Sequence, residues 1–264
     1  MIVPKKLING ISVVIKRICL LLPFSVVMSL VRLLLESQGF GAGARVETSG
    51  EIAAARSVLR AERDDPLVIF DIGANRGEYS ELILKAFPTA QIHAFEPSVE
   101  SFNLLSDRLK CYQNVSTYNC ALGKTEGQAL LYKETRLGRI ASLTRLDVTQ
   151  SNLTEEIAVR CLDSLLPSLD LQQINLVKID VEGHEMDVLL GAEGAIRSGT
   201  IRHIQFELGG SSVDTNTTLK MFFDFLGDYN YELCLIRPDS IYPLSNYKYS
   251  YEQYSTTNFL ARRR

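Results

Sequence analysis

Two patterns of hydrophobic positions alternate along the chain. Short continuous apolar runs are typical of strands buried on both faces of a sheet, and apolar residues recurring every three or four positions are typical of amphipathic helices. The runs predict strands over Leu67–Ile72, Gln91–Phe95, Val115–Cys120, Gln128–Lys133, Ala158–Leu166 (running into a short helix), Ile174–Asp180, Ile201–Leu208, Tyr231–Ile236 and Thr256–Leu260. The periodic segments predict helices over Glu51–Arg63, Glu78–Phe87, Ser98–Lys110, His184–Ala195 and Thr217–Gly227.

Strands and helices in this order predict an α/β fold, a doubly wound sheet with helices on both faces. Ligands of such sheets bind at the carboxyl ends of the strands, where the strand order reverses. Polar or reactive side chains stand at five predicted strand ends: Asp71, Glu96, Cys120, Asp180 and Glu207. We expect them to converge on one rim of the sheet.

The glycine-rich stretch Gly39–Gly43 separates an N-terminal helical extension, residues 1–45, from a domain over residues 46–264. The longest uncharged run of the extension, Ile18–Val31, has 14 residues, and a spanning helix needs about 20. We expect the extension to pack on the body of the protein. A peripheral membrane contact of residues 1–35 is the alternative, and a span or signal peptide is the least favoured reading.

Composition narrows the function classes. Of 264 residues, 46% are hydrophobic and 22% charged, which allows a full core, and the net charge of −3 gives no indication of nucleic-acid binding. The five cysteines are odd in number and none has C-x-x-C spacing, which favours reduced thiols and a cytoplasmic location, with membrane association through the N-terminus as an addition. The oligomeric state stays open.

The first predicted strand ends in the motif Asp71-x-Gly73-x-Asn75-x-Gly77. Glycines allow the chain to turn sharply into a helix and to approach a ligand closely. A dinucleotide fingerprint needs glycines at relative positions 1, 3 and 6, but Asn75 and Glu78 occupy the last two, so a nicotinamide enzyme is disfavoured. The spacing resembles motif I of class I methyltransferases, which bind S-adenosylmethionine. An ordinary strand-to-helix turn is the alternative.

Acidic residues stand where such a ligand would lie. Glu96 could accept both hydroxyls of a ribose, or it could simply favour the positive end of a helix. Asp180 and Glu182 could bind a substrate hydroxyl, take its proton or face a sulfonium charge, although acids are common at helix starts. His184 beside them is one of three histidines, and a lone histidine is more often structural than catalytic.

Six blocks of the chain together resemble the FkbM-type methyltransferases. They are IFDIGANRGEYS, HAFEPSVESF, NCALG, LDSLL, VKIDVEGHEMDVLLGA and IQFEL, between Val68 and Leu235. The resemblance implies a Rossmann-like sheet of about seven strands, mostly parallel with an antiparallel last strand, S-adenosylmethionine as cofactor, and O-methylation of sugars or secondary metabolites. The helices up to about Arg63 lie outside it.

Site residues follow from the resemblance position by position. It implies that the glycine loop holds the methionine end of the cofactor, that Glu96 holds the ribose and that residues 119–122 hold the adenine. The cofactor-binding residues expected are Asp71, Gly73, Ala74, Asn75, Gly77, Glu96, Pro97, Asn119, Ala121, Leu122, Ser142 and Asp180.

For the chemistry, we expect Asp180 to close the cofactor side while Glu182 and His184 address the acceptor hydroxyl, with Glu207 as a second candidate. A carboxylate or imidazole there can accept the proton that the hydroxyl loses. The sequence contains no compelling set of metal ligands. Asp180 and Glu182 are the pair that could serve as ligands if a metal were bound.

The acceptor, a small-molecule or glycan hydroxyl, is not identified. We expect Leu137–Thr154 and the tyrosine-rich segment Arg237–Tyr254 to shape its pocket, although the tyrosines could equally form a packed loop. The alternative function is a non-catalytic methyltransferase-like binding module, a scaffold at a membrane surface.

Overall fold

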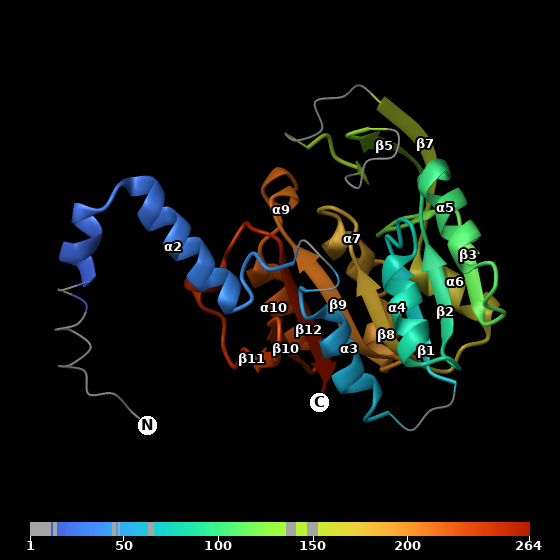
Figure 1. Ribbon diagram of the computed structural model, residues 1–264. Coiled ribbons are helices and arrows are strands. Elements are labelled where there is room, and N and C mark those ends of the chain that lie inside the picture. Colours follow the sequence, from blue (N-terminus) through green and yellow to red (C-terminus); the bar gives the residue numbers. More distant parts are fainter. Residues whose placement is uncertain are drawn as a thin grey trace.

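The computed structural model describes residues 12, 15–43, 46, 48–62, 66–135, 141–146 and 153–264. Their main sheet has eight strands in the order β11-β10-β12-β9-β8-β1-β2-β3 (Figure 1). The strands are β1 Val68–Ile72, β2 Gln91–Phe95, β3 Val115–Tyr118, β8 Ile174–Ile179, β9 Ile201–Leu208, β10 Tyr231–Ile236, β11 Ile241–Pro243 and β12 Thr257–Arg263. Parallel pairing joins β3, β2, β1, β8 and β9.

The last strand runs against its neighbours, as the family resemblance implies. β12 pairs antiparallel with both β9 and β10. The short edge strand β11 adds an eighth strand by pairing antiparallel with β10. Its three residues lie in the tyrosine-rich segment, which carries no strand pattern of its own.

Helices cover both faces of the sheet, which confirms the doubly wound fold. They are α3 Glu51–Leu59, α4 Glu78–Ala86, α5 Val99–Leu109, α6 Leu162–Leu169, α7 Glu185–Leu190, α8 Glu193–Ser198, α9 Ser211–Asp214 and α10 Leu219–Asp228. Successive strand residues point to opposite faces, and Ile69 and Phe70 of β1 accordingly enter different apolar clusters. Ile69 packs with residues of α3, α4 and α5, and Phe70 with residues of α6, α7, α8 and α10.

A second sheet of four strands lies beyond the carboxyl ends of the main sheet, at the top of Figure 1. Its strands are β4 Ala121–Leu122, β7 Leu153–Arg160, β5 Gly127–Lys133 and β6 Ala141–Ser142. The segment Leu137–Thr154 has too little periodicity to predict a strand, yet β6 and the start of β7 fall within it. Its residues 137–140 and 147–152 lie outside the described part. In β7 only Ile157 and Val159 are buried. Its first four residues therefore show none of the alternation of apolar and polar positions that predicts a strand.

The helix predicted over His184–Ala195 is broken. It forms α7 and α8, with Gly191 and Ala192 between them. A β-carbon on Gly191 would lie 2.0 Å from the carbonyl oxygen of Gly123. This contact joins positions 68 residues apart, so a local periodic pattern cannot reveal the break. The predicted helix over Glu51–Arg63 ends at Leu59, and Arg63 lies outside the described residues.

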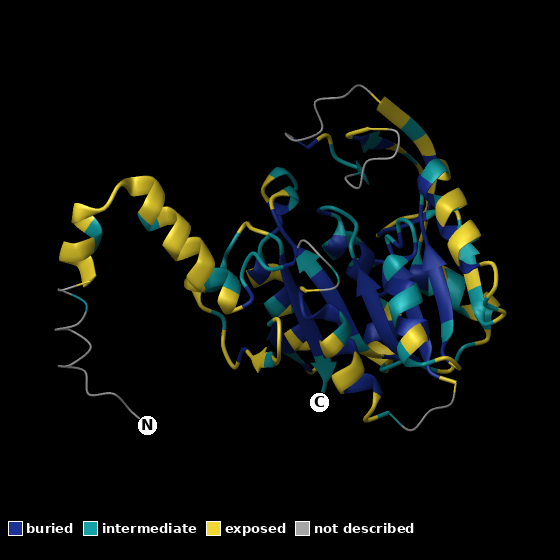
Figure 2. Ribbon diagram, in the orientation of Figure 1, coloured by how far each residue is buried: buried dark blue, intermediate teal, exposed yellow. Residues whose placement is uncertain are grey.

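The described residues of the N-terminal extension up to Ser37 do not pack on the body, contrary to expectation, whereas Gly39 and Phe40 contact it. Helix α2, Phe24–Ser37, has no buried residue and projects away from the domain (Figure 2). No helix in the part of the chain that is described has the length and apolar character to cross a bilayer. The domain boundary expected at residues 45 and 46 stays a prediction, since Arg45 is outside the described residues.

Candidate functional site

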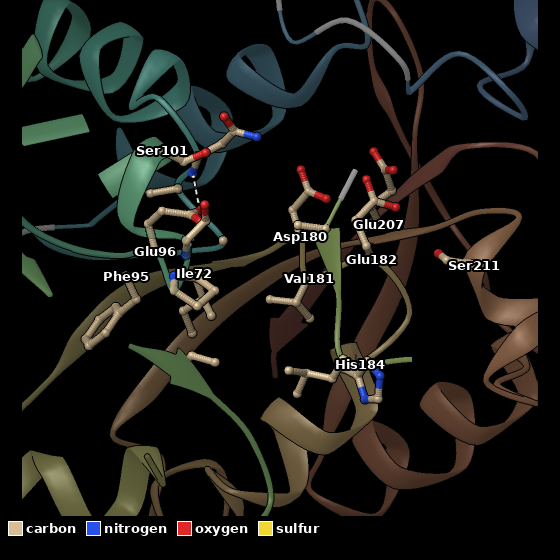
Figure 3. A pocket seen from close by; sticks show the side chains of 18 of the residues that line it. Ile72, Phe95, Glu96, Ser101, Asp180, Val181, Glu182, His184, Glu207 and Ser211 are labelled. Atoms are coloured by element: carbon tan, nitrogen blue, oxygen red, sulfur yellow. Dashed lines mark hydrogen bonds between the residues drawn. The ribbon is translucent and has the colours of Figure 1, made fainter. Parts of the chain in front are cut away.

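A cavity of about 890 Å³ opens at the carboxyl ends of β1, β2, β8 and β9 (Figure 3). The structure brings most of the predicted site residues to its wall. They are Gly73, Ala74, Asn75, Glu96, Pro97, Ala121, Leu122, Asp180, Glu182, His184 and Glu207. The other four, Asp71, Gly77, Asn119 and Ser142, do not line the cavity.

The glycine loop is held by its own protein neighbours. Gly73 has φ +79°, and a β-carbon there would lie 1.8 Å from the carbonyl oxygen of Asp180. The amides of Gly73 and Ala74 both donate to the Phe95 carbonyl, at 3.0 and 2.9 Å. Gly73 is therefore required because the ends of β1 and β8 meet here, before any ligand is considered. Gly77, at the start of α4, has φ +78°, and a β-carbon there would lie 2.8 Å from the side chain of the α5 residue Leu105.

The carboxylate of Glu96 is buried and fixed at the end of β2. Its Oε2 accepts the amide of Asn75 and its Oε1 the amide of Ser98, both at 2.9 Å. Burial raises its pKa to about 7. Each oxygen retains a second lone pair, so the group can accept two further hydrogen bonds from a ligand diol. Asn119 supports this turn by donating to the carbonyls of Glu96 and Pro97.

Asp71 lies beneath the cavity floor rather than on it. Its side chain is fully buried, Ser80 donates a 2.7 Å hydrogen bond to its Oδ2, and Lys178 Nζ lies 3.9 Å from its Oδ1. The same Nζ is 3.0 Å from Asp180 Oδ2. Burial lowers the pKa of Lys178, but the negative charges of Asp180, Asp71 and Glu51 together raise it by more, so the net shift is upward. Asp71 and Lys178 thus position Asp180 at the rim.

Several carboxyl groups face one another across the cavity. Asp180, Glu182 and Glu207 point into it together in Figure 3. Burial, Asp180 and Glu185 raise the pKa of Glu182 to about 8. Burial, followed by Asp180 and Glu51, raises the pKa of Glu207 well above its usual range. Such a site suits a cationic ligand and can accept a proton near neutral pH.

His184 is committed to protein contacts. Its Nδ1 is 2.9 Å from Asp187 Oδ2, and its Nε2 is 3.0 Å from Thr144 Oγ1. Nearby, the Ser142 hydroxyl donates a 2.7 Å hydrogen bond to the carbonyl of Glu182. These two links fasten β6 and the residues after it to the acidic rim. Both ring nitrogens are therefore occupied before an acceptor arrives.

The site also includes residues that the sequence reasoning missed. Glu51 of α3 lines the cavity, accepting hydrogen bonds from Ser49 Oγ at 2.7 Å and Gln205 Nε2 at 3.1 Å. Burial is the largest cause of its raised pKa. The sequence could have indicated Lys178, because a lysine inside a buried strand needs a charged partner. It gave no indication of Glu51, which lies outside the sequence blocks from which the site was predicted.

Glu185 was also missed. It is buried, and its Oε1 accepts the amides of Val181 at 3.2 Å and Gly183 at 3.1 Å. Gly183 has φ +103° and Glu182 φ +53°. Glu185 therefore stabilises the turn that carries Glu182. Among the described residues, no group of three or more His, Cys, Asp or Glu side chains is arranged to hold a metal ion.

Comparison with known families gives one match that covers most of the domain. The family described as "Methyltransferase FkbM domain" matches residues 71–233, which is more than half of the chain.

Three relatives share about a quarter of their aligned residues with the chain. "Methyltransferase 1" of Beauveria bassiana is 27% identical over 149 residues, which are 49% of this chain and 59% of that protein. "Hexuronic acid methyltransferase AglP" of Haloferax volcanii is 28% identical over 172 residues, 64% of this chain and 68% of that protein. "2-O-methyltransferase NoeI" of Sinorhizobium fredii is 25% identical over 167 residues, which are 58% of this chain and 68% of that protein. The chain thus spans about three-fifths to two-thirds of the length of these relatives.

Among solved structures, the precorrin-6y C5,15-methyltransferase of Geobacter metallireducens aligns with a TM-score of 0.44 at 16% identity. The alignment covers 81% of this chain and 87% of that one.

Proposed function

This chain belongs to the FkbM methyltransferase domain family, and we propose that it transfers a methyl group from S-adenosylmethionine to a hydroxyl group of a sugar or secondary metabolite. Two relatives are named for the methylation of hexuronic acid and for 2-O-methylation. The observation that carries the proposal is the cavity itself, in which the carboxyl group of Glu96 lies across from those of Glu182 and Glu207 (Figure 3).

The residues present fit this methyl donor. Glu96 offers two acceptor oxygens to the ribose hydroxyls, and Ala121 and Leu122 supply apolar wall for the base. Asp180, held by Lys178, supplies negative charge for the methionine end. A volume of about 890 Å³ lies within the ~300–1,000 Å³ range of ligand pockets. When bound, S-adenosylmethionine would supply a methyl group already activated on a positive sulfur.

The protein then has two tasks at the acceptor. It must hold the acceptor hydroxyl next to the donor, and positioning of this kind contributes up to ~7–11 kcal/mol. It must also receive the hydroxyl proton, and Glu182 is our candidate because its pKa of about 8 places it near the operating pH, as an efficient base requires. Glu207 is the second candidate. We assign His184 to positioning instead, because Thr144 and Asp187 occupy both of its nitrogens.

Two measurements test the proposal. Purified protein should bind S-adenosylhomocysteine in calorimetry, and it should transfer labelled methyl from S-adenosylmethionine to a component of a glycan or metabolite pool. The variant Glu182→Gln should retain binding and lose transfer, while Glu126→Gln, an exposed glutamate paired with Arg160, should retain both. Absence of nucleoside binding would overturn the proposal. Binding without transfer to any pool would instead support the non-catalytic module.

A further inference from the structure

The N-terminal arm, residues 15–37, exposes the most apolar surface of the described chain. It consists of a helical stretch over residues 15–21 followed by α2. Leu21 is 85% exposed, Phe24 79% and Leu34 68%, and no α2 residue is buried (Figure 2). Soluble proteins rarely expose a contiguous apolar surface of this extent without a partner.

The arm is joined to the domain by a defined turn. Gly39 has φ +100°, and a β-carbon there would lie 2.4 Å from the Ile236 carbonyl oxygen. The amide of Gly41 donates to Thr257 Oγ1 at 3.0 Å, and the ring of Phe40 stacks on Tyr251 at 6.3 Å. The C-terminal end of α2 is therefore fixed at the β10–β12 side of the sheet, and the apolar arm extends from that point.

Four of the five polar residues of α2 lie on one stripe, and the fifth, Ser37, is its last residue. Ser25, Ser29, Arg32 and Glu36 follow one another at spacings of four, three and four, which is one face of an α-helix. Arg32 Nε and Glu36 Oε1 form an ion pair along it at 2.7 Å. The remaining circumference is almost entirely apolar, which is wider than the single face that one partner helix would cover.

Length and charge favour one occupant for this surface. Fourteen residues of α2 extend about 21 Å at 1.5 Å per residue, which is less than the ~30 Å hydrocarbon core. The arm carries the basic residues Lys16, Arg17 and Arg32 against the single acid Glu36. The charges of α2 cancel, so the excess positive charge lies at Lys16 and Arg17. Exposed apolar side chains beside basic residues suit the interface of an anionic bilayer, where lipid covers the apolar surface and the basic residues meet the headgroups.

We propose that residues 15–37 bind the headgroup and acyl boundary of an anionic phospholipid bilayer and hold the domain there. Tyr249 extends the binding surface. It is 89% exposed and lies in the 3-10 helix Tyr249–Tyr251, whose last residue stacks on Phe40. Tyrosine suits this position because its ring is apolar and its hydroxyl is polar. The proposal is independent of the methyl-transfer reaction.

The test is flotation of the full chain with vesicles. Wild-type protein should float with phosphatidylcholine–phosphatidylglycerol vesicles, and with pure phosphatidylcholine at least tenfold less, with binding that weakens as salt increases. The triple variant Leu21→Asp/Phe24→Asp/Leu34→Asp should lose at least tenfold in bound fraction. Its thermal unfolding should match wild type, since none of these side chains is buried.

A matched control carries the same charge change elsewhere. The variant Leu104→Asp/Leu130→Asp/Met221→Asp replaces side chains that are 39%, 50% and 41% exposed on the domain, and it should float like wild type. Wild-type protein that stays with the soluble fraction, or a triple variant that still floats, would overturn the proposal. The proposal would also be overturned if light scattering showed a wild-type dimer that does not bind vesicles and that dissociates in the triple variant. A second copy of the chain would then cover the apolar surface.

Discussion

Glu96 and Glu182 carry the same functional group in two different settings. Glu96 accepts two backbone amides, which stabilise its ionised form, and burial still raises its pKa to about 7. Glu182 faces Asp180 and Glu185, so repulsion adds to burial and raises its pKa to about 8. The first setting suits a binding group and the second a proton acceptor.

Replacing the proposed base should change the pH profile as well as the rate. A base must be ionised, so kcat/KM of the wild-type enzyme should rise with pH and level off above about 8, the pKa of Glu182. Glu182→Gln should lower kcat by ~10²–10⁴-fold and remove this inflection. Rates between pH 6 and 9 measure both. An unchanged inflection in the variant would assign it to another group, Glu207 first.

Replacing the proposed ribose ligand should weaken binding instead. In Glu96→Gln, the new side-chain NH2 and the amide of Asn75 or Ser98 would both be donors, so one of the two hydrogen bonds that hold the side chain would be lost. The side chain would also no longer offer two charged acceptor oxygens to the ribose. A lost charged hydrogen bond costs ~1.5–3 kcal/mol, so the affinity for S-adenosylhomocysteine should fall by roughly 10–150-fold in calorimetry. The surface variant Glu81→Gln should leave affinity unchanged. Equal affinities in the two variants would remove Glu96 from the site.

At the scale of elements, the close meeting of β1 and β8 gives a direct stability test. Gly73→Ala places a β-carbon 1.8 Å from the Asp180 carbonyl oxygen at φ +79°. The two strand ends would have to separate, and we expect a loss of about 4 kcal/mol in the free energy of unfolding, or no folded protein. Gly127→Ala has no atom within 4 Å of the added carbon and should change stability by less than about 0.5 kcal/mol. Similar melting temperatures for both variants would contradict the geometry.

Elements buried on both faces could be predicted from the sequence, whereas half-exposed ones were predicted only in part: the strand expected over Gln128–Lys133 is β5, but its partner strand was not placed correctly. Strand β8 is buried at every position, so its apolar run is complete. Strand β7 is buried at only two positions, and the sheet that it forms was missed. The same limit applies to the site. Asp180 and Glu182 follow a strand that a pattern reveals, whereas Glu51 enters the cavity from α3 by tertiary packing alone.

At the scale of the whole molecule, the fold concentrates acidic groups in one buried place. Their folded-state pKa values are raised, to about 7 for Glu96 and Glu185 and about 8 for Glu182, with Glu51, Asp71 and Glu207 raised as well. Lys178 lies among them. Because carboxyl groups in an unfolded chain ionise near pH 4.5, the folded protein holds more protons than the unfolded one at neutral pH.

The stability of the ligand-free protein should therefore fall as pH rises from 7 to 8.5. Each extra proton held by the folded state lowers the free energy of unfolding by about 1.4 kcal/mol per pH unit, and 1 kcal/mol shifts Tm by ~2–4 °C in a domain of this size. The lowered pKa of His93, about 4, acts below this window. We expect Tm to fall by at least about 3 °C, and by less in Glu182→Gln.

The cationic donor should reverse this trend, because a positive sulfur favours the ionised carboxyls. Saturating S-adenosylmethionine should raise Tm more at pH 8.5 than at pH 7, while S-adenosylhomocysteine, whose sulfur is uncharged, should show a smaller difference between the two pH values. Scanning fluorimetry with both ligands in wild type and Glu182→Gln makes the comparison. A ligand-free Tm that rises with pH would contradict the raised carboxyl pKa values. Equal pH dependence for the two ligands would mean that the acidic cavity does not face the sulfonium.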